Sequence, residues 1–162
     1  MEEINDWREG LQSPDLELRA VAAERLCQAG SDASDAAVDL VRASGDDQAV
    51  SNWAVAALED LGTPPISTVE SLTALALDKN AIVAYWAATL LGRLGPDATN
   101  SQATLASVLT TSPEVAVQER IAWALGKIGA TSEEALIALR HKAKGDDSRL
   151  SRLAQEALEH SD

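Results

Sequence analysis

Large aromatic side chains are scarce in this sequence of 162 residues, which has no phenylalanine, one tyrosine and four tryptophans. A wide globular interior usually contains several large rings that fill its volume. Alanine and leucine supply most of the apolar share instead, and both are strong helix formers with slim or flexible side chains. The composition therefore predicts an all-α fold of closely packed helices.

Cysteine and basic residues are also in short supply. The single cysteine, Cys27, excludes an internal disulfide and a cysteine-based zinc site. The 26 acidic residues outnumber the 13 basic ones, and the net charge of −13 repels nucleic-acid phosphates and anionic lipids. No apolar run approaches the roughly 18 residues of a membrane span, and residues 1–10 do not resemble a signal peptide. We therefore expect a cytoplasmic protein with neither nucleic acid nor membrane as its partner.

The chain repeats itself at intervals of 32, 33, 34 and 33 residues. The copies cover Leu18–Gly30, Val50–Gly62, Val83–Gly95 and Val117–Gly129, and a fifth begins at Leu150. Within each copy, apolar residues at offsets 0, 4, 8 and 11 form one stripe of an amphipathic helix. The glycine that closes the first four copies suits a left-handed carboxyl-terminal cap. Each copy thus predicts one helix, and a second helix fits before the next copy, at about residues 34–43, 68–77, 101–110 and 132–144.

A single helix pair cannot bury its apolar face, so neighbouring pairs must stack into a solenoid. We expect one repeat domain over residues 1–162. Its parts are a cap (1–12), four repeats (13–44, 45–77, 78–111 and 112–145) and a carboxyl-terminal half-repeat (146–162). Ile4, Trp7 and Leu11 share one face of the leading helix, which predicts that this helix covers the first repeat.

The run Val117–Gly129, preceded by Ser112-Pro113-Glu114, resembles a HEAT repeat, and more narrowly the short bacterial subtype of phycobilisome-lyase-like proteins. The resemblance implies a right-handed α-α superhelix whose second helices line a concave groove. HEAT repeats often carry an arginine after the opening aliphatic residue, where it pairs with an acid of the preceding turn. This sequence has an arginine there only in the first copy, at Arg19, so we expect the stack to rely on apolar packing.

The histidines, the cysteine and the acidic residues do not occur in a spacing that is typical of a catalytic site. His141 and His160 lie in different copies without the His-Glu dipeptides of some HEAT-type iron enzymes. Cys27 has no histidine nearby in the sequence, and the paired acids occupy helix ends and turns, where they cap and solubilise. We therefore expect no enzyme activity, no cofactor and no metal.

The tryptophans bear on packing and binding. Trp53 and Trp86 share a repeat offset that predicts packing between copies, and a cation-π contact of Trp86 with Arg120 is expected if they are neighbours. Trp123 takes the most outward angle of its helix. Tryptophan is enriched at binding hot spots, so Trp123 is a candidate contact for a partner or for a second copy of the chain, with burial under a neighbouring loop as the alternative.

The predicted second helices offer further partner-binding candidates on their polar faces. These are Asp35, Asp39, Glu70, Arg140 and His141, and Gln102 is expected on a polar face of the same kind. Residues 1–50 hold 12 acids and 4 bases, whereas residues 112–162 hold 9 acids and 7 bases. The amino-terminal half would thus attract a basic peptide or protein, and a negative surface kept for solubility is the rival explanation.

The sequence therefore predicts a non-catalytic protein-interaction or scaffold module. One alternative is an accessory subunit of a lyase- or chaperone-like complex. A second is a HEAT-like DNA glycosylase, which the negative charge disfavours. The identity of the partner and the oligomeric state stay open.

Overall fold

The computed structural model describes residues 2–161, with the side chain of Glu2 left aside, and they contain helices and turns but no strand. The all-α fold class predicted from the sequence is confirmed. Backbone contacts divide the chain into two compact units, residues 1–68 and 69–162. The boundary falls inside the predicted repeat 45–77. The two units are described separately below.

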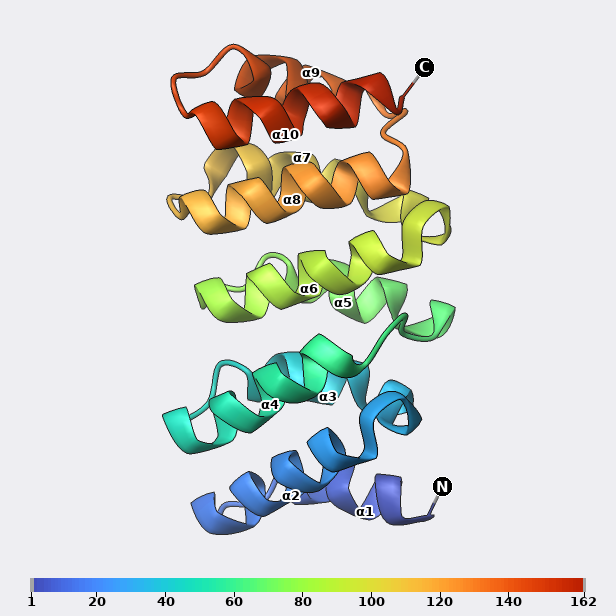
Figure 1. The fold of residues 1–162 in the computed structure, drawn as a ribbon, viewed down its shortest axis with the longest axis vertical. Helices are drawn as coiled ribbons and strands as arrows, with labels where there is room; N and C mark the ends of the chain where they lie inside the picture. The colour runs from blue at the N-terminus through green and yellow to red at the C-terminus, as the bar shows by residue number, and fades with distance from the viewer. Residues whose placement is uncertain (1, 162) are drawn as a thin grey trace. The chain divides into compact units, whose positions relative to one another are not determined.

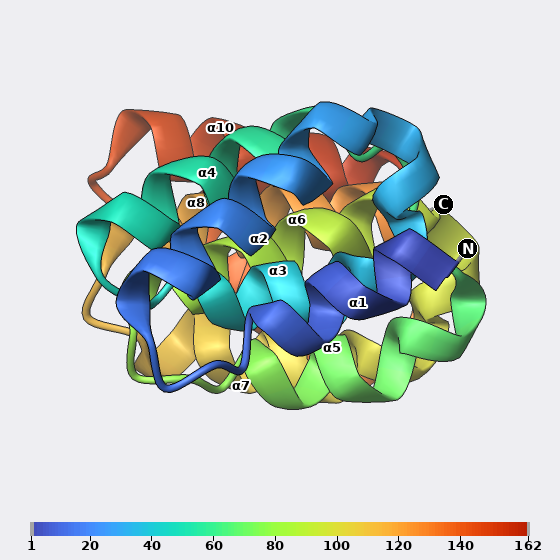
Figure 2. The ribbon, with the colours of Figure 1, turned by 90° about the horizontal axis from the view of Figure 1, so that it is seen from below.

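Unit 1 begins with α1 (Glu2–Gly10), which packs on α2 (Leu16–Ala29). The unit continues through the 3-10 segment η1 (Gly30–Ala36), α3 (Ala37–Ala43), α4 (Gln48–Asp60) and η2 (Ile66–Thr68). Figures 1 and 2 show α2 and α4 side by side in one layer, with α1 and α3 in the other. Leu26, Leu40 and Leu58 are fully buried between these layers, as the stripe of apolar positions predicts.

Unit 2 has the same two-layer arrangement. One layer contains α6 (Ala81–Leu94), α8 (Val115–Ile128) and α10 (Ser148–Glu159). The other contains α5 (Val69–Leu75), α7 (Gln102–Thr111) and α9 (Glu133–Ala143), and the 3-10 segment η3 (Gly95–Ser101) leads into α7. Within the first layer α8 packs against both α6 and α10, and α7 packs against α9 in the second (Figure 1).

The closing glycines lie at or just after the ends of the first four long helices, as predicted. Gly129 has the predicted left-handed conformation, whereas Gly30 and Gly95 combine a positive φ with ψ angles of −129° and −135°. All four have positive φ angles, from 54° at Gly30 to 81° at Gly129, and no other residue type does so in the described chain. Two details were not predicted. The chain enters 3-10 turns directly after Gly30 and Gly95, before the second helix of the pair starts. Leu18, the opening residue of the first stripe, is 57% exposed, because the short helix α1 meets α2 near Ala22 and leaves it uncovered.

The residue that follows the opening aliphatic residue of each copy has different partners from those expected. The Nε of Arg19 lies 2.7 Å from a carboxylate oxygen of Asp46, which belongs to the following turn and not to the preceding one. Arg19 also donates to the carbonyl of Ser13 in its own preceding turn. Ser51, Gln118 and Ser151 are its counterparts in later copies, and each donates to a carbonyl before its helix. A hydrogen bond to the preceding turn, not an ion pair, is thus what these four copies share.

Candidate functional site

The side chain of Trp123 lies against the neighbouring helix α6 and is half-buried. The indole ring fills the space over Gly92, where an added methyl group would overlap the ring atom Cζ3. The expectation that Trp123 points outward, or is covered by a loop, is therefore wrong. Its helix angle alone would expose it, but the missing side chain at Gly92 lets the ring fold down onto α6.

Arg120 is held between two aromatic rings on the same face of unit 2. Its Cζ lies 4.5 Å from the ring centre of Tyr85 and 4.9 Å from that of Trp123, and its Nη2 donates to the Tyr85 hydroxyl. The expected contact of Arg120 with Trp86 is wrong. Trp86 is 8% exposed and packs edge-on against Tyr85, so Tyr85 is the ring on α6 that Arg120 reaches.

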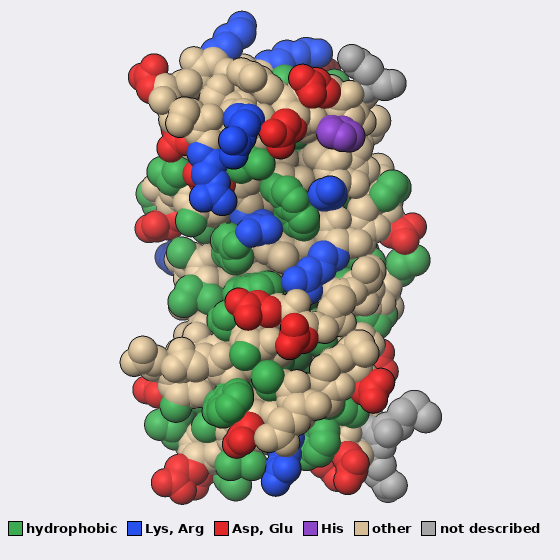
Figure 3. Space-filling model, in the orientation of Figure 1, with side chains coloured by type: hydrophobic (Ala, Val, Ile, Leu, Met, Phe, Trp, Pro, Cys, Tyr) green, Lys and Arg blue, Asp and Glu red, His purple; other side chains and the backbone are tan. Residues whose placement is uncertain are grey.

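Two shallow hollows flank Trp123 and Leu153 between α8 and α10. The first has a volume of about 230 Å³ and is also lined by Tyr85, Glu119, Arg120 and Arg149. The second, of about 190 Å³, is lined by a further set that includes Lys127, Glu156 and His160. Figure 3 shows this face, on which blue lysine and arginine side chains gather over α8 and α10. We call the residues of both hollows the Trp123 surface.

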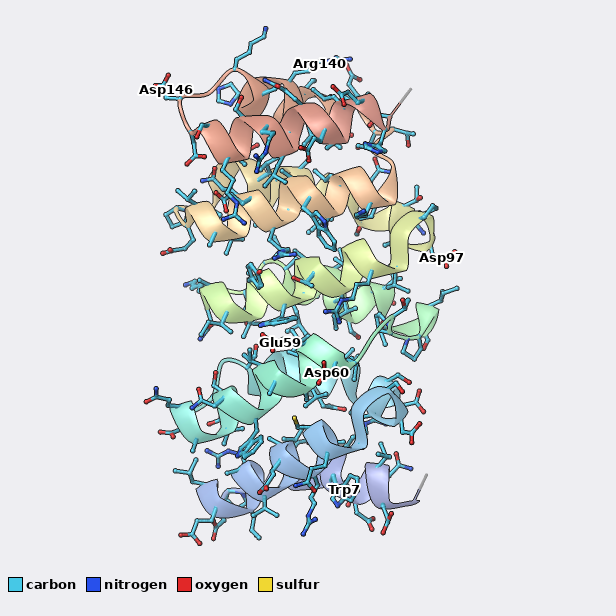
Figure 4. The ribbon with its side chains drawn as sticks, viewed as in Figure 1. Trp7, Glu59, Asp60, Asp97, Arg140 and Asp146 are labelled. Carbon is cyan, nitrogen blue, oxygen red and sulfur yellow. The ribbon has the colours of Figure 1, made fainter. Side chains whose placement is uncertain are left out.

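Unit 1 carries a hollow of about 630 Å³ beside α1 and η1, and its charged lining residues are acidic, whereas basic side chains gather on the Trp123 surface. Trp7 on α1, labelled in Figure 4, contributes a half-buried indole to its wall. Glu3, Asp32 and Asp35 line the same hollow, so three carboxylates and one aromatic ring contribute to its walls. We call this site the Trp7 hollow. Asp35 is the one predicted site residue that lines this hollow. For Trp7 the sequence predicted only that it lies on the face with which the leading helix covers the first repeat.

The other predicted candidates do not converge on one site. Asp39 is 12% exposed and accepts a hydrogen bond from the Nε of Arg8 at 2.8 Å, so it ties α3 to α1. Glu70 is exposed in the first turn of α5. Arg140 is exposed on α9, in the last turn of that helix (Figure 4). His141 lines a largely apolar groove of about 560 Å³ between α7 and α9, together with the exposed side chain of Ile137.

Gln102 was expected on the polar face of a second helix, but it is only 2% exposed. Its side-chain carbonyl oxygen accepts hydrogen bonds from the backbone N–H groups of Thr131 and Ser132, at 2.8 and 2.9 Å. These N–H groups lie at the start of α9 and would otherwise have no partner within their helix. Gln102 therefore fastens α7 to the turn between α8 and α9.

The described nucleophilic and metal-ligating side chains include one cysteine, Cys27, and two histidines. Among residues 2–161, no three His, Cys, Asp or Glu side chains come together closely enough to hold a metal ion. Burial, aided by the negative charges of Asp60, Glu24 and Glu59, raises the pKa of the Cys27 thiol. A raised pKa keeps this thiol protonated at neutral pH, whereas a nucleophilic cysteine requires a lowered one. Within the part of the chain that the structure describes, no helix has the length and apolar character needed to cross a bilayer.

Known structures share this fold over almost the whole chain. An engineered protein matches 99% of this chain and 80% of its own, with 22% identity and a TM-score of 0.65. A designed armadillo repeat protein in complex with the peptide (KR)4 matches 98% of this chain and 82% of its own, with 17% identity and a TM-score of 0.65. The complex of CpcE and CpcF of phycocyanin lyase from Nostoc sp. PCC7120 contains a chain that is 25% identical, with a TM-score of 0.63. That match covers 98% of this chain and 64% of the lyase chain.

At the level of sequence, no curated protein matches this chain significantly. The family model of HEAT repeats matches residues 69–159, which is more than half of the 162 residues. This segment contains the run Val117–Gly129, on which the resemblance rests, and α5 to α10 of unit 2. The chain therefore belongs to the HEAT-repeat family.

Proposed function

We propose that this protein is a non-catalytic interaction module and that its Trp7 hollow receives a basic side chain of a partner protein or peptide. The observation that carries the proposal is that three carboxylates and one half-buried indole line the same hollow of about 630 Å³. A lysine or arginine placed there would meet both an aromatic face and opposite charges. Cation-π contacts contribute about 0.5–2 kcal/mol, according to how far the pair is desolvated.

The charge of unit 1 supports a basic partner. Residues 1–68 contain 14 acidic and 4 basic side chains, and two of these bases, Arg8 and Arg19, are already paired with Asp39 and Asp46. A surface with this excess attracts cationic segments and raises their rate of association. The rival explanation, an acidic surface that only maintains solubility, predicts no preference for the residues of the Trp7 hollow.

The other predicted contacts remain part of the proposal. Trp123, Asp39, Glu70, Arg140 and His141 are each proposed as a partner contact, at separate places on their own units. Asp39 would contribute indirectly, because its ion pair with Arg8 keeps α1 in place. We also propose that residues 1–162 work as one repeat domain, in the cytoplasm, without a cofactor.

The octapeptide (KR)4 is a suitable first probe, because a designed repeat protein of similar fold binds it. We expect binding that weakens steeply as the salt concentration rises. Asp35→Asn and Trp7→Ala should each weaken binding by about 5-fold or more, in keeping with the loss of one charged or cation-π contact. Asp6→Asn is the matched control, since Asp6 is an exposed acid on the same helix as Trp7 that does not line the hollow. Equal effects of Asp6→Asn and Asp35→Asn would contradict the proposal and favour the solubility explanation.

A second candidate is an accessory subunit of a lyase complex, which the match to the phycocyanin lyase structure favours at 25% identity. Such a subunit needs a partner chain. Purified CpcF from Nostoc is the probe, with size-exclusion chromatography and light scattering as the readout. A co-eluting complex of defined stoichiometry would support this candidate, and two separate peaks would contradict it.

A further inference from the structure

We propose that the Trp123 surface is a second binding site, selective for an acidic segment of a partner protein. In this site Arg120 and Arg149 bind a carboxylate, and Trp123 with Leu153 receives a neighbouring apolar side chain. The residues involved lie in unit 2 and are distinct from those of the Trp7 hollow. The inference therefore does not rest on the preference of unit 1 for a basic partner.

The guanidinium of Arg120 is already held in one orientation, which favours the binding of an anion. The two rings at 4.5 and 4.9 Å hold its guanidinium in place, so little side-chain entropy remains to be lost on binding. Among the described residues no carboxylate lies within 4.0 Å of it, and its one hydrogen bond goes to the neutral Tyr85 hydroxyl. A half-buried arginine without a carboxylate partner, in a molecule so rich in acids, is open to an external one.

Arg149 lines the same hollow from the neighbouring helix α10. Its Nε lies 3.3 Å from a carboxylate oxygen of Glu119, but its side chain is 68% exposed. Glu119 is only 18% exposed, so Arg149 keeps this partner, and the exposed remainder of its guanidinium can contact an incoming carboxylate as well. Two arginines on adjacent helices, one held by rings and one largely exposed, can bind the two oxygens of one carboxylate.

The surroundings of this pair favour a negatively charged segment with an apolar side chain next to the acid. Three cationic side chains line the Trp123 surface, against two acidic ones. The cations are Arg120, Lys127 and Arg149, and the acids are Glu119 and Glu156. Trp123 and Leu153 form the ridge between the two hollows, so an apolar side chain can lie on either side of it. Tryptophan, tyrosine and arginine are the residues most enriched at energetically dominant positions of interfaces.

The remaining negative charge of the chain does not prevent this binding. Residues 69–162 contain 12 acidic and 9 basic side chains, so unit 2 is far closer to neutral than unit 1. At physiological ionic strength, charges more than about 8 Å apart in solvent are largely screened. The arginines that contact the ligand therefore dominate its interaction.

The test uses an acetylated hexapeptide of alternating glutamate and leucine, with glutamine–leucine and lysine–leucine hexapeptides as matched controls. Fluorescence polarisation gives the Kd, and the indole N–H signal of Trp123 in an ¹H–¹⁵N spectrum, assigned with Trp123→Phe, reports the location. We expect the glutamate peptide to bind at least about 5-fold more tightly than either control and to shift the Trp123 signal. No shift of that signal, or equal affinity for the glutamine peptide, would overturn the proposal.

Substitutions of single arginines show which positive charges bind the glutamate peptide. Arg149→Gln and Arg120→Gln should each weaken binding of the glutamate peptide by about 5-fold or more. Arg152→Gln is the control, because Arg152 is similarly exposed on α10 but does not line the hollow. Since Arg120 is also packed between rings, Arg149→Gln carries the test if Arg120→Gln lowers stability. Equal effects of Arg149→Gln and Arg152→Gln would refute a specific site. Asp35→Asn should leave glutamate-peptide binding unchanged, which separates this proposal from that for unit 1.

Discussion

Adding a single methyl group at Gly92 is expected to destabilise unit 2 through a clash with Trp123. In the structure, a Cβ placed at Gly92 overlaps the indole ring and lies 3.1 Å from the Cα of Ala124 in α8. The ring can rotate away only by leaving its place over α6, and the Ala124 backbone can retreat only if α8 moves. Overpacking of this kind costs about 1–3 kcal/mol.

The substitution Gly92→Ala also brings a gain that must be subtracted. Alanine is favoured over glycine within a helix by about 1 kcal/mol. The net expectation is a loss of about 0–2 kcal/mol in the free energy of unfolding. Because these terms oppose each other, the single variant does not isolate the clash, and a double-mutant cycle is required.

The cycle combines Gly92→Ala with Trp123→Ala, and urea unfolding followed by far-UV circular dichroism gives the four stabilities. In the Trp123→Ala background the ring overlap is gone and only the approach to Ala124 remains. The cost of Gly92→Ala should therefore fall by at least about 1 kcal/mol there. The same effect in both backgrounds would show that Trp123 does not lie on Gly92, and the geometry of the Trp123 surface would be wrong.

Three further predictions concern other parts of the chain. Gln102→Ala should lower the free energy of unfolding by about 1–3 kcal/mol in urea titrations, because two partly buried backbone N–H groups just before α9 lose their acceptor; an unchanged midpoint would contradict this role. The hydrogen bond from Arg19 lowers the pKa of Asp46, so the pair stabilises the folded state above about pH 4 and loses this effect as the pH falls through the lowered pKa. Asp46→Asn should therefore show a smaller acid-induced loss of stability than the wild type, and identical pH profiles would refute it. Because burial raises the pKa of the Cys27 thiol, iodoacetamide should modify the native protein at pH 8 more slowly than the urea-unfolded protein, and equal rates would be the contrary result.

Much of the fold could be predicted because it follows from local sequence. The apolar stripe places Leu58 and Leu125 in the core, and the glycine spacing predicts where the long helices end. The 3-10 turns after Gly30 and Gly95 could not be predicted in this way, since they follow from how each second helix docks and not from a periodic pattern.

The candidate sites were less predictable, because each depends on residues distant in the sequence. Asp35 was proposed from its polar position, but nothing in the local sequence places Trp7 beside it. Gln102 resembles a surface residue in its own helix, and the N–H groups that donate to it lie in a turn 29 and 30 residues away. A buried polar side chain can be recognised only when its hydrogen-bonding partners are known.

Consecutive residues are enough to predict the helical class, the helix pairs and the regions where the long helices end. These features depend on backbone preferences and on apolar periodicity within about one helix length, both of which can be read from consecutive residues. Three contacts became visible only in the folded chain: Trp123 lies on Gly92, Arg120 stacks between two rings, and Asp39 pairs with Arg8. Each of these contacts joins different helices, so the exposure of one side chain is set by the size and charge of its neighbour across the interface.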